Sequence, residues 1–205
     1  MTVADARKRN PVATRASILN AAEKLFVNMG FAATSMSDIA RRAGVTKSLI
    51  HHHFGSKEEL WDEVKRQRMR HYADIQRQLI AEKDDGEAGV LRRSIEAYFH
   101  FLRESPEFVR LAVWMNLEDP RLSQMTFPEL VTLGVERIEQ EQRAGRIRDD
   151  VEPRHLVIMF VSLCMYWFMA RSTGFSGLVP EDPQEADSAY LEDLLKVFFL
   201  GVRPR

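Results

Sequence analysis

The spacing of proline and glycine along the chain constrains its fold more than any other feature of the sequence. Breakers are sparse, and they separate stretches in which apolar residues recur every three or four positions, as on one face of a helix. Pro106, Pro128, Pro153 and Pro183 each stand at the start of such a stretch, where the missing backbone N–H costs nothing. No alternation of apolar and polar residues is long enough to predict a sheet. The sequence therefore predicts an all-α protein of about nine helices.

Residues suited to helix ends place the predicted boundaries. Gly30 is expected to end the first helix, Ser35 is a candidate N-cap, and Ser56 with Glu59 forms a capping box. Gly44 permits a sharp turn because it tolerates a positive φ. We expect helices at residues 13–29, 36–43, 46–52, 57–82, 90–104, 106–117, 128–144, 153–171 and 183–200.

Charge is distributed unevenly along the 205 residues, although the formal net charge is only −1. Residues 1–70 contain thirteen Lys or Arg and seven Asp or Glu, whereas residues 71–205 contain sixteen and twenty-three. A basic first third before an acidic remainder is typical of a nucleic-acid-binding module joined to a body with another role.

The single cysteine and the longest apolar run both point to the cytoplasm. Cys164 excludes an internal disulfide, and its apolar neighbours favour a buried thiol over a redox sensor. The run 156–170, broken only by Ser162, would extend about 22 Å as a helix, less than the roughly 30 Å hydrocarbon layer of a membrane. The N-terminal residues lack the apolar run of a secretory signal. We expect a cytoplasmic, nucleoid-associated protein with no membrane partner.

Two short predicted helices, 36–43 and 46–52, are separated by Gly44 and the apolar Val45, which is the layout of a helix-turn-helix. Apolar or small residues occupy the positions that would hold the two helices together. The second helix would then present polar donors suited to base edges and phosphates in a major groove, namely Thr46, Lys47, Ser48, His51 and His52.

The same segment resembles the signature of the tetracycline-repressor (TetR) family. The agreement covers about residues 14–60 and includes Ile39-Ala40, Ala43-Gly44-Val45, His53-Phe54 and Lys57-Glu58 with Leu60. The resemblance implies nine helices, with a helix-turn-helix DNA-binding domain at residues 1–56 and a ligand-binding and dimerisation domain at residues 57–205.

The resemblance also implies roles for individual residues. Base or groove contacts fall on Lys47, Ser48 and His51, and phosphate contacts fall on Ser35, Thr46, His52, His53 and Lys57. Two positions depart from the family pattern. His51 stands where a tyrosine is usual, so a ring N–H is expected to donate in place of the phenol, and Ser48 stands where glycine is common.

Several of these residues also have a purely structural interpretation. Ser35 and Ser56 would serve as N-caps whether or not they touch DNA, and Arg41 and Arg42 are more typical of a solvated face. Lys57 lies at a helix N-terminus, which attracts anions. The consecutive histidines 51–53 point in three directions on a helix and cannot converge on one ion, so no metal site is expected.

The acidic remainder contains no nucleophile elbow, phosphate-binding glycine loop or defined carboxylate pair, so we expect neither an enzyme nor a cofactor. The resemblance implies a cavity for a small molecule, and aromatic and methionine linings suit apolar or amphipathic ligands. We single out Trp114, Met115, Met159 and Tyr166 as candidate ligand contacts.

Dimerisation is expected through the helices at residues 153–171 and 183–200, because both carry more apolar surface than a monomer would cover. The sequence thus predicts a homodimeric regulator, most simply a repressor that a small effector releases from a palindromic, double-stranded operator. The alternative is a DNA-binding regulator of the same fold without a small-molecule effector.

Overall fold

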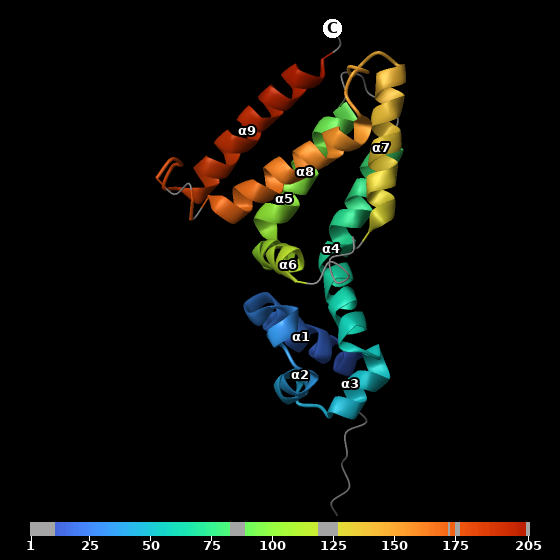
Figure 1. The fold of residues 1–205 in the computed structure, drawn as a ribbon, viewed down its shortest axis with the longest axis vertical. Helices are drawn as coiled ribbons and strands as arrows, with labels where there is room; N and C mark the ends of the chain where they lie inside the picture. The colour runs from blue at the N-terminus through green and yellow to red at the C-terminus, as the bar shows by residue number, and fades with distance from the viewer. Residues whose placement is uncertain (1–10, 83–88, 119–126, 172, 175–176, 204–205) are drawn as a thin grey trace, which may run out of the picture. The chain divides into compact units, whose positions relative to one another are not determined.

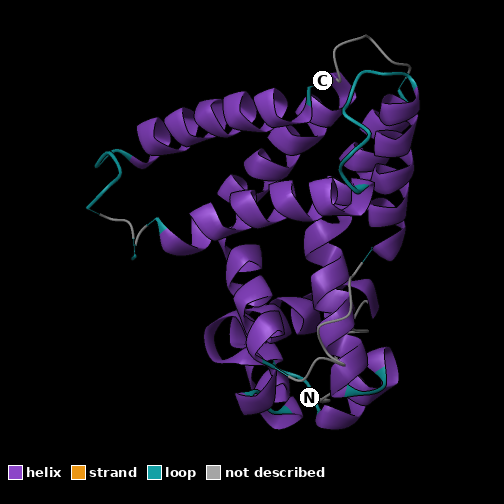
Figure 2. Cartoon of the chain, turned by 45° about the horizontal axis from the view of Figure 1, so that its top comes forward, coloured by secondary structure: helices purple, strands orange, loops and turns teal. Residues whose placement is uncertain are grey.

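A computed structural model describes residues 11–82, 89–118, 127–171, 173–174 and 177–203, and these residues form helices and loops without strands (Figure 2). In order, the helices of the described chain are α1 (Pro11–Ala33), α2 (Met36–Ala43), α3 (Lys47–Phe54), α4 (Lys57–Ala81), α5 (Gly89–Glu104), α6 (Pro106–Leu117), α7 (Pro128–Arg143), α8 (Pro153–Ala170) and α9 (Pro183–Val202) (Figure 1). The predicted all-α class and its nine helices are confirmed over this part of the chain.

Helix α1 is longer than the sequence predicts. Gly30 has φ 77° and ψ 179°, a conformation open in practice only to glycine, and it interrupts the helix as expected. The chain then resumes a helical turn up to Ala33. Helix α3 begins one residue later than the sequence predicts, because Thr46 is its N-cap rather than its first residue.

The described chain divides into two compact units. The first contains the residues up to Gln67 together with Trp114–Glu118, and the second contains Arg68–Val113 and the residues from Phe127 onward. This division falls inside α4, whereas the sequence places a domain boundary at residue 56. Helix α6 begins in the second unit and ends in the first.

The core of the first unit gathers one apolar face from each of its helices. Ile18, Phe26, Ile39 and Ile50 are fully buried, as is Trp61 at the start of α4. The ring of Phe26 meets Trp61 edge-on with centroids 5.0 Å apart. At about 25 cal/mol per Å² of buried apolar surface, side chains of this size fix the short helices α2 and α3, which would not be stable alone.

In the second unit, α8 packs against α5 and α7. A buried acid ties α9 to α8: Asp187 accepts a 2.8 Å hydrogen bond from the indole Nε1 of Trp167 and pairs with Arg171. Tyr190 of α9 stacks on Trp167, with ring centroids 4.1 Å apart. Cys164 is fully buried among these helices, and burial raises the pKa of its thiol to about 12, which suits an inert thiol.

By length and composition alone, α8 is the one helix of the described residues that is apolar enough to cross a membrane. The same test is passed by core helices of globular proteins, and the inner face of α8 contributes Leu156, Val157, Phe160 and Trp167 to the core.

Candidate DNA-binding surface

Local capping residues define the two helices of the predicted motif. Ser35 caps α2, and its Oγ accepts a 3.1 Å hydrogen bond from the backbone N–H of Asp38. The Ser35 hydroxyl in turn donates to the carboxylate of Asp38 and, together with Arg41, lowers the pKa of that carboxyl. Gly44 ends α2 in the left-handed conformation, φ 66° and ψ 36°. Thr46 then caps α3 by accepting from the N–H of Leu49 at 3.3 Å.

Helix α3 therefore has a fixed start and a clear outward face. Ile50 is fully buried, whereas Lys47, Ser48 and His52 are exposed. No residue of the described chain forms a hydrogen bond or ion pair with the ammonium of Lys47 or the hydroxyl of Ser48. These groups are available to an external partner such as a base edge.

Three histidines continue the same helix with different surroundings. The ring of His51 bonds the carbonyl oxygen of Gly55 through Nδ1, at 2.6 Å. The rings of His52 and His53 lie edge to face with centroids 5.6 Å apart, and His53 is partly buried beside Phe54. Within the described chain no three His, Cys, Asp or Glu side chains gather as a metal site.

Lys57, the first residue of α4, makes contacts that the sequence does not predict. Its ammonium donates to the carbonyl oxygens of Phe31 and Thr34, each at 2.7 Å, and lies 4.1 Å from the centre of the Phe31 ring. Burial lowers the pKa of this ammonium, although the negative charges of Glu58 and Glu118 act to raise it. Two of its three N–H groups are thus used within the protein, and the third has no hydrogen-bond partner in the described chain.

Ser56 and Glu59 form the reciprocal capping box that the sequence predicts. The N–H of Glu59 donates to Ser56 Oγ at 3.1 Å, and the N–H of Ser56 donates to the Glu59 carboxylate at 2.7 Å. The structural interpretation of Ser56 is therefore confirmed.

The C-terminal end of α6 stabilises the kinked end of α1. The indole Nε1 of Trp114 donates to the carbonyl oxygen of Val27 at 3.1 Å, and the carboxylate of Glu118 accepts from the N–H of Ala32 at 3.0 Å. A Cβ on Gly30 would lie 2.7 Å from the Trp114 ring. These contacts join residues 87 and 86 positions apart, which no local pattern could predict.

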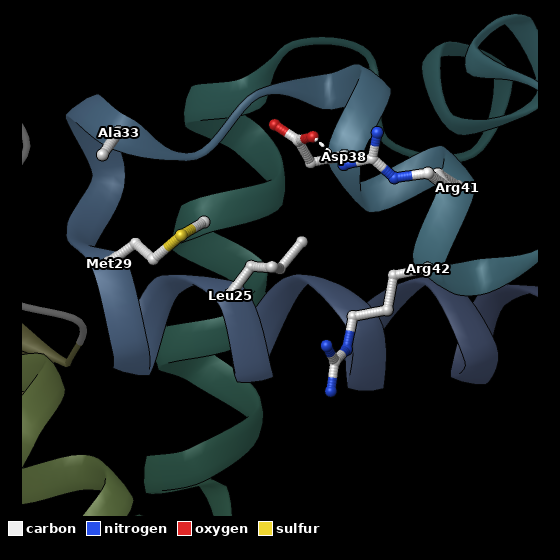
Figure 3. Close-up of a pocket in the computed structure, with 6 residues that line it drawn as sticks. All are labelled: Leu25, Met29, Ala33, Asp38, Arg41 and Arg42. Atoms are coloured by element: carbon white, nitrogen blue, oxygen red, sulfur yellow. Dashed lines mark hydrogen bonds and ion pairs between the residues drawn. The ribbon is translucent and has the colours of Figure 1, made fainter.

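A shallow hollow of about 460 Å³ opens between α1 and α2, and Figure 3 shows the side chains around it. Its aliphatic part comes from α1 and its charged part from α2; the lining residues are Leu25, Met29, Ala33, Asp38, Arg41 and Arg42. Asp38 and Arg41 form an ion pair there, and both arginines are exposed, which agrees with the solvated face that the sequence predicts.

The four candidate ligand contacts do not gather in one unit. Trp114 and Met115 belong to the first unit, where Trp114 contacts α1. Met159 and Tyr166 lie on α8 in the second unit and are 49% and 57% exposed. Their contact with a ligand remains a prediction.

A helix-turn-helix with exposed polar donors on its second helix, joined to a larger helical unit, defines the class of DNA-binding transcriptional regulators. Two family models agree: that of the tetR family of bacterial regulatory proteins matches residues 18–64, and that of the tetracyclin repressor-like C-terminal domain matches residues 90–190. The chain belongs to the TetR family.

Individual relatives support this assignment, and a solved structure shares the fold. The transcriptional repressor NicS of Pseudomonas putida is 31% identical over 166 residues, which is 78% of each chain. The transcriptional activator FasR of Mycolicibacterium smegmatis is 35% identical over 97 residues, which cover 47% of this chain and only 44% of FasR. The fatty acid degradation regulator FadR from Bacillus halodurans has the same fold, with a TM-score of 0.72 at 17% identity, over 97% of this chain and all of that one.

Proposed function

We propose that this TetR-family regulator is a homodimeric repressor that binds a palindromic operator through α3 and is released by a small apolar or amphipathic effector. The observation that carries the proposal is the outward face of α3, where Lys47 and Ser48 are exposed and have no partner in the described chain. A repressor is the simplest form, and NicS, which aligns over most of both chains, is named as one. The protein of this chain would act in the cytoplasm, on the DNA of the nucleoid.

Within this proposal, the DNA contacts divide between bases and phosphates. Lys47, Ser48 and His51 would reach base edges in the major groove, because they lie on the exposed face of α3. Phosphate contacts would come from the flanking positions Ser35, Thr46, His52, His53 and Lys57. The cap hydroxyls of Ser35 and Thr46 accept bonds from backbone N–H groups; the Thr46 proton is free to donate, whereas the Ser35 proton is donated to Asp38 and would have to turn toward a phosphate.

The proposed dimer interface is an apolar face that the chain leaves uncovered. On α8, Ile158, Met159, Leu163 and Tyr166 are 46–57% exposed, and on α9 Val197 and Leu200 are 72% and 63% exposed. Monomeric proteins rarely expose apolar side chains in such numbers on neighbouring elements. A two-fold axis through this face would cover both copies at once and would present two α3 helices to a palindrome.

This assignment changes the interpretation of two candidate ligand contacts. Because Met159 and Tyr166 belong to the exposed face of α8, their exposure favours the dimer interface over an enclosed cavity. The effector would instead act on the core of the second unit, to which α6 contributes Phe108 and Val109. The last turn of the same helix carries Trp114, which bonds to α1 of the DNA-binding unit, so a shift of α6 would reach that unit.

A thermal-shift screen of small molecules, coupled to a DNA-release assay, tests the effector. A compound that binds the protein, present at a free concentration about a hundred times its Kd, should raise the free energy of unfolding by about 2.7 kcal/mol. The same compound should release the duplex. Compounds that stabilise the protein but never release DNA would favour the alternative, a regulator without a small-molecule signal.

A further inference from the structure

His51 is held by two hydrogen bonds to the residue that ends its helix. Its Nδ1 lies 2.6 Å from the carbonyl oxygen of Gly55, and its own carbonyl oxygen accepts from the N–H of Gly55 at 2.9 Å. A carbonyl oxygen only accepts hydrogen bonds, so the proton in the first bond belongs to Nδ1. In the neutral ring, Nε2 then has no hydrogen and can only accept.

The hydrogen bond to the His51 ring depends on the backbone conformation of Gly55. Gly55 has φ 73° and ψ −103°, which turns its carbonyl back toward α3. A Cβ at this position would lie 2.2 Å from the carboxylate of Glu59, which is itself bonded to the N–H of Ser56. The positive φ therefore favours glycine at the residue whose carbonyl orients the His51 ring.

A ring nitrogen that can only accept a hydrogen bond, such as Nε2 of His51, has few partners on DNA. Phosphate oxygens are acceptors, so neutral Nε2 cannot bond to them. In the major groove, guanine offers O6 and N7 and thymine offers O4, which are acceptors as well. Adenine N6 and cytosine N4 carry the amino hydrogens that an acceptor requires.

We propose that His51 accepts a hydrogen bond through Nε2 from the amino group of an adenine or a cytosine, and that it does not contact phosphate. The inference rests on the proposed placement of α3 in the major groove. It reverses the sequence-based expectation that the His51 ring donates. A tyrosine, usual at this position in the family, can donate through its hydroxyl, so the histidine narrows the set of partners.

The tautomer can be tested without DNA. Long-range ¹H–¹⁵N correlation of the ¹⁵N-labelled protein at about pH 8, where imidazoles are usually neutral, distinguishes a protonated nitrogen from a bare one. We expect His51 to be protonated at Nδ1 and bare at Nε2. The exposed His52, whose ring contacts only His53 in the described chain, is the internal control. A proton on Nε2 of His51 would overturn the inference.

The base preference is tested by selecting duplexes from a random library at the same pH, with the wild type, His51→Ala and His51→Arg. The wild type should prefer one base pair, whose adenine or cytosine carries the donated amino hydrogen, at one position in each half-site by about fivefold or more, as single base pairs usually contribute. His51→Ala should lose that preference and keep the others. His51→Arg should select guanine there, because its fork donates to O6 and N7.

Each other result of the selection has a defined meaning. If His51→Ala relaxes no position, the inference is wrong although the protein binds DNA. If no sequence is enriched by the wild type, the proposed DNA-binding surface fails and the inference fails with it. The tautomer measurement separates these cases, since it reports on His51 alone.

Discussion

Two lysines of the DNA-binding unit differ in what they contact, and so their variants should differ. Lys47 is exposed on α3 and has no partner in the described chain. We expect Lys47→Ala to cost about 1 to 3 kcal/mol on the selected operator and much less on a scrambled duplex, because a base contact is lost. Lys24→Ala, which removes an exposed lysine from α1, is the matched control. Equal losses on both duplexes, measured by fluorescence anisotropy, would show that Lys47 contacts only phosphate.

Lys57 combines a structural role with the proposed phosphate contact. Lys57→Met removes two charge-assisted hydrogen bonds to the carbonyl oxygens of Phe31 and Thr34. We expect a loss of about 2 kcal/mol in the free energy of unfolding, by chemical denaturation. If the third N–H bonds a phosphate, the salt dependence of operator binding should also fall by about one unit per site. Unchanged stability would contradict the observed contacts.

At the scale of the elements, the kink of α1 depends on one glycine and one distant ring. Gly30→Ala would place a Cβ at positive φ and 2.7 Å from the Trp114 ring. We expect this variant to lose more than about 2 kcal/mol of stability, since the backbone cost and the steric cost add. Gly145→Ala is the control, because Gly145 also has a positive φ, of 69°, but a Cβ there meets nothing within 4 Å. Similar losses in both variants would mean that the Trp114 contact adds nothing.

The elements also show what the sequence could and could not predict. Both ends of α2 and the start of α4 follow from Ser35, Gly44 and Ser56, because capping is decided within four residues. The last turn of α1 could not be predicted, since Trp114 and Glu118 hold it. The partners of Lys57 were missed for the same reason: they lie 23 and 26 residues away. The orientation of the His51 ring depends on the backbone angles of Gly55, which sequence alone does not give.

At the scale of the whole molecule, the proposed dimer depends on which face of α9 is left uncovered. The sequence shows apolar residues around most of this helix and cannot say which of them the chain's own core takes. The structure buries Leu194 and Phe198 and exposes Val197 and Leu200. A charge at Leu194 would therefore damage the fold, whereas a charge at Val197 tests the interface.

We expect Val197→Asp to fold normally and to shift the protein from dimer to monomer at micromolar concentration, because association would bury an unpaired carboxylate. Sedimentation velocity measures the change, and circular dichroism checks the fold. Leu178→Asp is the matched control, since Leu178 is 82% exposed in a loop outside the proposed interface. A monomeric wild type, or a dimer that survives Val197→Asp, would contradict the interface.

Footprinting on the selected operator tests most directly whether the protein binds DNA as a dimer through its two α3 helices. Hydroxyl-radical cleavage should show two protected stretches related by the symmetry of the palindrome, with centres about one helical turn or somewhat more apart. Lys47→Ala should weaken both stretches together, and Val197→Asp should require a much higher concentration to protect either. A single protected stretch at saturation, or protection that both variants leave unchanged, would contradict a dimer that binds through α3.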